Sequence, residues 1–207
     1  KRILSIFLSL LMIVSVLPVG VLSANAASPS LQNAINWAVA IANDNSHGYS
    51  WVSAWRNGPD YDCSSLVGNA LYNGGFTSAG TKLKTMSTRS EESILKQLHF
   101  NDVTHSVNLS TGSGLRAGDV LWVGGHTEMY IGNGQLVGAH QSSKPCYCSN
   151  NHGCRGYHIG CYNCGEKAGD QTGSEISVTK YRNHPWSKVF RYNGSAPSLS
   201  LIHISEP

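Results

Sequence analysis

One cysteine stands apart from the other five in this chain of 207 residues. Cys63 begins the helix-like segment CSSLVGNALYN, whereas the other cysteines all lie between positions 146 and 164. The first backbone N–H groups of a helix have no partner inside the helix, and the helix dipole favours negative charge there. A thiol in that place loses its proton more easily, and the same N–H groups stabilise an oxyanion. The pattern therefore favours Cys63 as a nucleophile, with a disulfide to the downstream cysteines as the alternative.

A thiolate nucleophile needs a base that is held in place by a third group. His126 is the best candidate for the base, because it begins an expected strand directly after a pair of glycines. His140 ends the strand after the next turn and is expected to orient the imidazole. Glu128 falls on the same strand face as His126, so it is expected either to orient the ring instead or to contact substrate. A single histidine is more often an ordinary surface or core residue. The spacing therefore makes these residues candidates for catalysis and does not by itself assign them a role.

The elements that would position these side chains can be predicted from periodicity. Apolar residues at helical spacing predict helices over 31–42, over 63–73 before a Gly-Gly stop, and over 88–98. The period then changes and predicts strands at 119–123, 126–131, 135–140, 175–179 and 188–192. Helices followed by an antiparallel meander indicate an α+β fold.

The two ends of the chain differ in character from the middle. Residues 1–26 combine Lys1-Arg2, a long apolar run and an Ala-Asn-Ala exit, which predicts a cleaved secretory signal peptide rather than an uncleaved membrane anchor. Residues 193–198 have the composition of a linker. The last stretch, LSLIHISEP at 199–207, resembles a translated sequencing adapter, so we expect it to be an artefact.

The net charge is only +3 and the basic residues are scattered, which gives nucleic-acid binding no support. No later segment is apolar for long enough to span a membrane, so we expect no stable membrane association after cleavage of the signal. The mild positive balance suits a secreted protein that acts near an anionic cell surface, and we expect it to be a monomer.

Several ordered motifs resemble a known family. They are YDCSSLV at 61–67, LRAGDVL at 115–121, GHTEMYIG at 125–132 and GDQTG at 169–173. Together they resemble the NlpC/P60-type peptidoglycan hydrolases, and among these most strongly the phage-lysin branch of peptidoglycan amidohydrolases. The resemblance implies a catalytic domain over 29–192 with a papain-like fold, in which N-terminal helices pack on a small antiparallel sheet.

The resemblance also implies a Cys–His–polar catalytic set that needs no cofactor. By motif, the nucleophile is Cys63 and the base is His126, while Asp62 and Ser64 flank the nucleophile and are expected to hold the stem peptide. The chain departs from the family in two places. It has Ser65 where many members have glycine, and it has Gly138 where many place the third polar residue, so that His140 is the nearest substitute.

The expected function is therefore that of a secreted, cysteine-dependent peptidoglycan hydrolase. The bond that it cuts is either the muramoyl–L-alanine amide, which would make it an amidase, or a bond within the stem peptide, which would make it an endopeptidase. The alternative from another class is a non-catalytic wall-binding or zinc-stabilised structural module. A binding module needs neither a reactive thiol nor a base.

The cysteine-rich segment over 144–168 is interpreted as an insertion into this domain. Its Cys-x-Cys and Cys-x-x-Cys spacings, with His152 and His158 nearby, suit a tetrahedral zinc site. Export favours disulfides slightly instead, although five cysteines leave one thiol unpaired. Both interpretations stay open.

Overall fold

The computed structural model describes residues 29–51, 53–140 and 175–194. The predictions for the signal peptide (1–26), the cysteine-rich insertion (144–168) and the adapter-like tail (199–207) lie outside the described residues. Within the described part of the chain, no helix is both long and apolar enough to cross a membrane.

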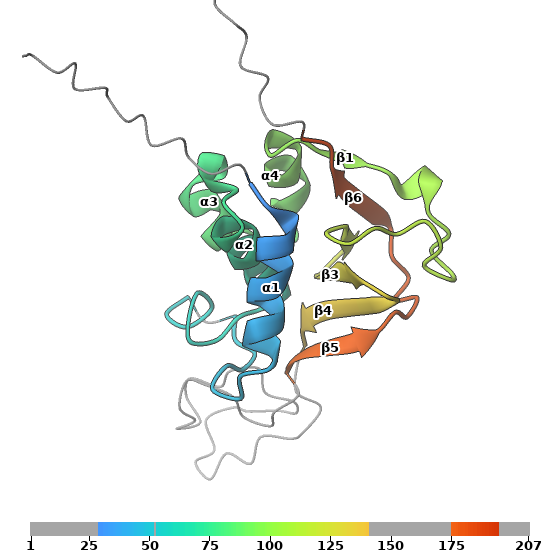
Figure 1. Cartoon of the computed structure of the whole chain (residues 1–207). Coiled ribbons are helices and arrows are strands. Elements are labelled where there is room, and N and C mark those ends of the chain that lie inside the picture. Colours follow the sequence, from blue (N-terminus) through green and yellow to red (C-terminus); the bar gives the residue numbers. More distant parts are fainter. Residues whose placement is uncertain (1–28, 52, 141–174, 195–207) are drawn as a thin grey trace, which may run out of the picture.

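The domain has two layers, with the helices gathered against one face of an antiparallel sheet (Figure 1). The six strands lie in the order β1-β6-β2-β3-β4-β5. Their bounds are Phe100–Asp102 (β1), Val120–Val123 (β2), His126–Gly132 (β3), Gln135–Ala139 (β4), Ile176–Lys180 (β5) and Lys188–Tyr192 (β6). The helices are α1 (Leu31–Ala42), α2 (Cys63–Asn73), α3 (Thr81–Lys84) and α4 (Glu91–Gln97), with 3-10 turns at Thr77–Ala79 and Thr104–Ser106. The predicted α+β class is confirmed.

Helix α2 is the central element, because it packs on α1 and α3 and on strands β3 and β4. Every residue from Cys63 to Leu71 is buried. Gly68 allows this close packing, since a Cβ there would lie 2.0 Å from the Leu83 carbonyl oxygen of α3. The helix that carries the candidate nucleophile is therefore fixed on several sides.

Helix α1 begins and ends as its sequence predicts. Ser30 is the N-cap, and its hydroxyl accepts a hydrogen bond from the backbone N–H of Asn33. The start of α1 packs directly against Gly74, the residue after α2. A Cβ on Gly74 would lie 2.8 Å from the Ala34 Cβ and 2.8 Å from the Ser30 carbonyl oxygen. The short contact between the two helices depends on that glycine.

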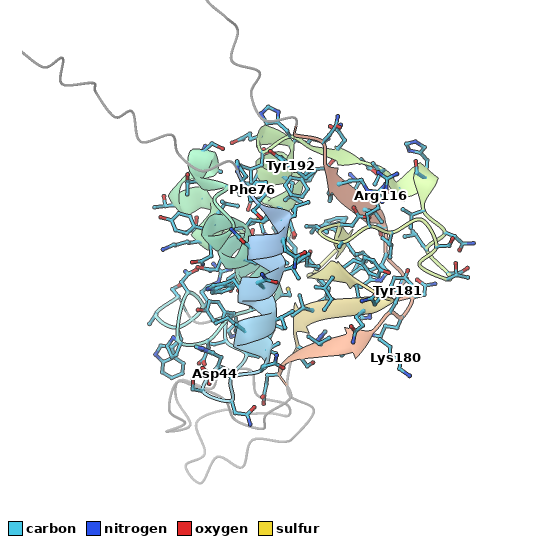
Figure 2. The ribbon with its side chains drawn as sticks, in the orientation of Figure 1. Asp44, Phe76, Arg116, Lys180, Tyr181 and Tyr192 are labelled. Atoms are coloured by element: carbon cyan, nitrogen blue, oxygen red, sulfur yellow. The ribbon has the colours of Figure 1, made fainter. Side chains whose placement is uncertain are left out.

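The core joins the helical layer to the edge of the sheet. The Phe76 ring, just after α2, meets the Tyr192 ring of β6 edge-on, with 4.9 Å between their centroids (Figure 2). Strand β1, which the sequence analysis did not predict, pairs with β6 at this edge. It has three residues, too few for alternation to show. The helix predicted over 88–98 is α4. It begins at Glu91 rather than at Thr88, because Ser87 and Ser90 form a hydrogen-bonded turn before it.

Candidate active site

Cys63 is the first residue of α2, and it faces the start of β3. Its side chain is buried, and Sγ lies 3.9 Å from the carbonyl oxygen of Gly125, the residue before His126. The predicted position at a helix N-terminus is confirmed. Cys63 has no disulfide partner among the described residues, while the other cysteines lie outside them.

The Cys63 thiol does not have the lowered pKa that its position at a helix start predicts. Burial raises the pKa of the Cys63 thiol to about 12. The charge of Asp62, and that of Glu91 when it is ionised, raise it further, whereas backbone hydrogen bonds from Thr127 and Ser64 lower it. The favourable helix start does not compensate for the loss of water around the sulfur. The thiol is therefore neutral at rest, and its proton has to be removed as the nucleophile attacks.

His126 is held by Glu128, the residue two positions further along β3. His126 Nε2 lies 2.9 Å from Glu128 Oε1, and the same oxygen accepts a 2.7 Å hydrogen bond from Nη2 of Arg182. Burial alone would raise the pKa of Glu128, but His126, His140 and Arg182 outweigh burial and lower it. An ionised Glu128 favours the tautomer whose Nε2–H donates to it, which leaves the Nδ1 lone pair free to accept a proton.

His140 lies next to this pair without joining it. Its Nε2 is 3.9 Å from Glu128 Oε1, and its ring centroid is 5.3 Å from that of His126. Burial, together with the positive charges nearby, lowers the pKa of His140 to about 4, although Glu128 opposes the shift. The expected orienting hydrogen bond from His140 is thus absent in this geometry, and Glu128 makes that hydrogen bond instead.

Gly138 explains why the third polar group comes from β3 rather than β4. A Cβ at Gly138 would lie 2.6 Å from Glu128 Cγ and 3.1 Å from His140 Nε2. The Glu128 side chain fills the space that a larger residue at 138 would need. The departure from the family pattern noted in the sequence is therefore matched by a glutamate on the neighbouring strand.

His126 and His140 line a cavity of about 250 Å³, together with Tyr49, Gly125, Ala139 and His184. Gly125 is also the residue whose carbonyl oxygen lies 3.9 Å from Cys63 Sγ. His126 stacks on Trp186, with 5.8 Å between ring centroids and 20° between planes. A larger hollow of about 620 Å³ lies along α4, but it is lined by Arg89, Glu92, Ser93, Lys96 and Gln97, none of which is a candidate nucleophile. The smaller cavity is therefore the candidate active site.

The segment 181–187, between β5 and β6, was missed as a source of site residues. It supplies Arg182, His184 and Trp186, all within contact distance of His126 or Glu128. Its letters YRNHPWS are rich in polar and aromatic residues, which was the available signal. It has no strand or helix periodicity, so the sequence did not indicate where it lies.

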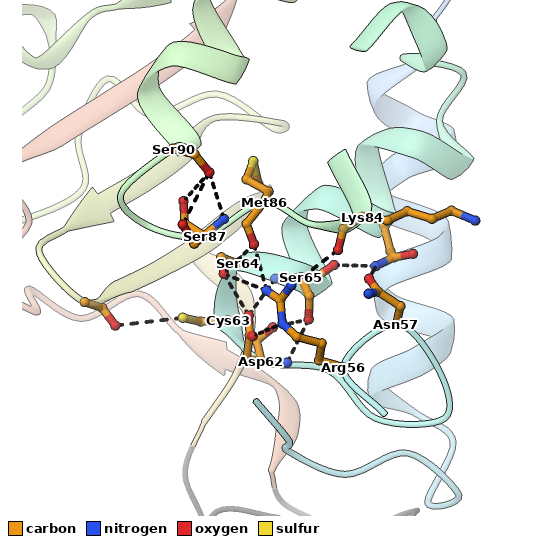
Figure 3. Close-up of polar contacts among 12 residues, drawn as sticks. Arg56, Asn57, Asp62, Cys63, Ser64, Ser65, Lys84, Met86, Ser87 and Ser90 are labelled. Carbon is orange, nitrogen blue, oxygen red and sulfur yellow. Dashed lines mark hydrogen bonds and ion pairs between the residues drawn. The ribbon is translucent and has the colours of Figure 1, made fainter. Parts of the chain in front are cut away.

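The polar groups of Asp62 and Ser64, which the motif led us to expect at the substrate, make hydrogen bonds inside the fold. Both are buried, and Asp62 Oδ1 accepts hydrogen bonds of 2.7 Å from the Ser64 hydroxyl and from the Ser65 N–H (Figure 3). Asp62 Oδ2 lies 2.6 Å from Nε of Arg56. These groups are already occupied inside the fold, where they cap α2.

Ser65 has a structural role at the position where many family members have glycine. Its hydroxyl accepts a 2.8 Å hydrogen bond from the backbone N–H of Asp62, while its own N–H donates to the Asp62 carboxylate. The two residues form a reciprocal capping box. The side chain at 65 therefore stabilises the helix start next to the candidate nucleophile.

The chain matches a family described as "Bacteriophage peptidoglycan hydrolase" (Amidase_5) over residues 30–164. No curated protein matches it by sequence.

Two solved structures are similar to part of this chain. One is the P60 domain of antigen MAP1204 from M. avium subspecies paratuberculosis, with 16% identity and a TM-score of 0.41, covering 78% of this chain and 96% of that one. The other is the peptidoglycan hydrolase RipB from Mycobacterium tuberculosis, with 17% identity and a TM-score of 0.37, covering 78% of this chain and 65% of that one. Likenesses this weak assign no residue a role.

Proposed function

We propose, because this chain belongs to the bacteriophage peptidoglycan hydrolase family, that it cleaves an amide bond of peptidoglycan with Cys63 as the nucleophile. Family membership supports hydrolase activity on peptidoglycan. The cysteine mechanism is supported by one arrangement. The thiol at the start of α2 lies beside the strand that carries the His126–Glu128 pair, and His126 lines the cavity. A wall-binding module would have no use for that arrangement.

The proposed reaction begins with a neutral thiol. His126 Nδ1 takes the Cys63 proton as the sulfur attacks the carbonyl carbon, and Glu128 stabilises the imidazolium that forms. The N–H groups at the start of α2 hold the oxyanion. His126 then returns the proton to the leaving amine, and water, activated by the same imidazole, hydrolyses the thioester.

The roles first expected for the site residues change in part. We propose Cys63 as nucleophile, His126 as base and acid, and Glu128 as the residue that orients His126. His140 then lines the cavity rather than completing the catalytic set. We also propose, from the composition of residues 1–26, that the protein is exported and acts at the cell wall.

The deciding experiment is digestion of purified sacculi with the wild type, with Cys63→Ala and with the control Ser113→Ala. Ser113 is an exposed turn residue outside the cavity. Cys63→Ala should remove lysis, by a factor on the order of 10⁶ if it matches nucleophile loss in a serine hydrolase. Thermal unfolding of the variant should resemble that of the wild type. Lysis by Cys63→Ala at the wild-type rate would refute the mechanism.

The products of the same digestion identify the bond. A new N-terminal L-alanine means cleavage of the muramoyl–L-alanine amide. A new free amine on the diamino acid means cleavage within the stem peptide.

A further inference from the structure

Two buried polar atoms next to the cavity make no hydrogen bond within the described part of the chain. They are Glu128 Oε2 and His140 Nε2. The Glu128 side chain is completely buried, so Oε2 has no compensating contact with bulk water. A buried polar atom without a partner costs free energy, and such atoms cluster where a ligand binds. Glu128 Oε2 is an acceptor, and His140 Nε2 is one in the neutral tautomer that carries its proton on Nδ1. A cation that both atoms bind would satisfy both.

The ligand atoms of His126, Glu128 and His140 all lie within 4.8 Å of one another. Imidazole nitrogen with carboxylate oxygen is a donor set that suits zinc and neighbouring divalent metals. Ligands at roughly 2.0–2.2 Å from a tetrahedral ion lie ~3.4 Å apart, so only small side-chain shifts would be needed. The fourth position would open onto the cavity, which His126 and His140 both line.

Arg182 shapes this donor set without blocking it. Its guanidinium donates to Glu128 Oε1, while Oε2 stays unpaired. A carboxylate that binds a metal through one oxygen commonly accepts a hydrogen bond on the other, and this outer contact fixes its orientation. Arg182 therefore occupies Glu128 Oε1 and leaves Oε2 without a partner.

We propose that His126, Glu128 and His140 bind a divalent transition-metal ion of the zinc type, and that this ion inhibits the enzyme. To bind the metal through Nε2, a neutral His126 has to carry its proton on Nδ1. That nitrogen then cannot accept the proton of Cys63, and the hydrogen bond to Glu128 is lost as well. The binding of the metal is independent of the proposed function, whereas the inhibition rests on it.

The cysteine-rich segment over 144–168 is itself a candidate zinc site, with disulfides as the alternative, so the test has to separate it from the cavity site. Calorimetric titration with Zn²⁺ would compare the wild type, His140→Ala, Cys63→Ala and the control His105→Ala, an exposed histidine in a turn. Titration with Co²⁺ would be followed in parallel by visible absorption. Thiolate ligands add a sulfur-to-cobalt charge-transfer band, which a His–Glu–His site lacks.

The expected result is that His140→Ala loses one equivalent of Zn²⁺ relative to both the wild type and His105→Ala. Cys63→Ala should keep that equivalent although it no longer lyses sacculi. Zn²⁺ should inhibit lysis by the wild type, and His140→Ala should need at least ~10-fold more Zn²⁺ for the same inhibition. Equal stoichiometry in His140→Ala and the wild type would overturn the site. Loss of the equivalent in Cys63→Ala would also overturn it, because the ligand would then be the thiol.

An NMR measurement on the wild type tests the site without any substitution, so its result does not depend on whether His140→Ala folds. Substoichiometric Co²⁺ should broaden the ring-proton NMR signals of His126 and His140 while His105 stays sharp. Sharp signals from both cavity histidines would refute the proposal. Loss of lysis in Cys63→Ala together with that result would leave the proposed function standing without the metal site.

Discussion

The two sides of the active site are built in different ways. On the helix side, Asp62 is bonded to Arg56, Ser64 and Ser65, and its carboxylate oxygens are fully used inside the fold. On the sheet side, Glu128 and His140 each keep a buried atom without a hydrogen bond. The satisfied side rigidly positions Cys63. The unsatisfied side has capacity left for a ligand, and it is the side that faces the cavity.

The largest loss of activity is expected from removing the general base on the sheet side, His126. His126→Ala should reduce lysis of sacculi by roughly 10²–10⁴, the usual contribution of a general acid–base. The matched control His105→Ala should lyse at the wild-type rate, since His105 is exposed and outside the cavity. Initial rates of turbidity loss at equal enzyme concentration make the comparison. An unchanged rate for His126→Ala would remove this residue from the mechanism.

A sharper test separates the two neighbours of His126. Glu128→Gln should lower the rate on the order of 10²-fold, because the amide no longer stabilises an imidazolium at Nε2. His140→Gln should have a smaller effect, since His140 makes no hydrogen bond to His126. Rates measured over a range of pH should show the Glu128→Gln loss throughout. The reverse order of effects would return the orienting role to His140.

Substitutions on the helix side should lower the stability of the fold rather than remove a catalytic group. Arg56→Met leaves the buried Asp62 carboxylate without its partner at 2.6 Å, and it should lower the free energy of unfolding by roughly 3 kcal/mol. The double variant with Asp62→Asn should recover part of this loss, because the unpaired charge is gone. Urea unfolding measures both. A double variant less stable than Arg56→Met would contradict the ion-pair explanation.

The last effect is on the pH dependence of stability, and it concerns Glu91, whose side chain is completely buried against β3. The Thr127 hydroxyl is 2.7 Å from Glu91 Oε1 and 2.9 Å from the Leu121 carbonyl, yet it has one proton. A protonated Glu91 that donates to Thr127 satisfies both contacts. Burial raises the pKa of Glu91 to about 8, in agreement with a neutral carboxyl near neutral pH.

This raised pKa gives stability a defined pH dependence. The folded state keeps the Glu91 proton up to about pH 8, whereas the unfolded chain loses it near the ordinary value of 4.5. The contribution of Glu91 to the free energy of unfolding is complete below pH ~4.5. It falls as the pH rises toward 8, because the unfolded state then binds fewer protons than the folded state. Glu91→Gln should flatten the curve, which melting temperatures at pH 5 and pH 8 measured for both proteins would reveal. An identical slope in the variant would contradict a protonated Glu91.

Some of this site could be predicted from the sequence because it is local. The N-cap, the capping-box position and the glycine stop lie within a dozen residues of Cys63, so the helix and its reactive first residue follow from neighbours in the chain. The pairing of His126 with a residue two positions away follows in the same manner from strand alternation. The two-residue spacing places Glu128 on the same strand face as His126. The sequence analysis nevertheless gave the role of orienting His126 to His140.

The remaining features were decided by tertiary packing. The distance from α2 to β3 determines how deeply Cys63 is buried, and this burial reverses the pKa shift expected from the helix start alone. The choice between Glu128 and His140 depends on the space above Gly138, which no local pattern contains. Arg182 reaches Glu128 across 54 residues of sequence because β5 and β6 return the chain to the cavity. The sequence by itself determined which residue types can react, whereas three-dimensional packing decided which of them are buried, paired or left unpaired, since desolvation and hydrogen bonding depend on neighbours that are distant in the chain.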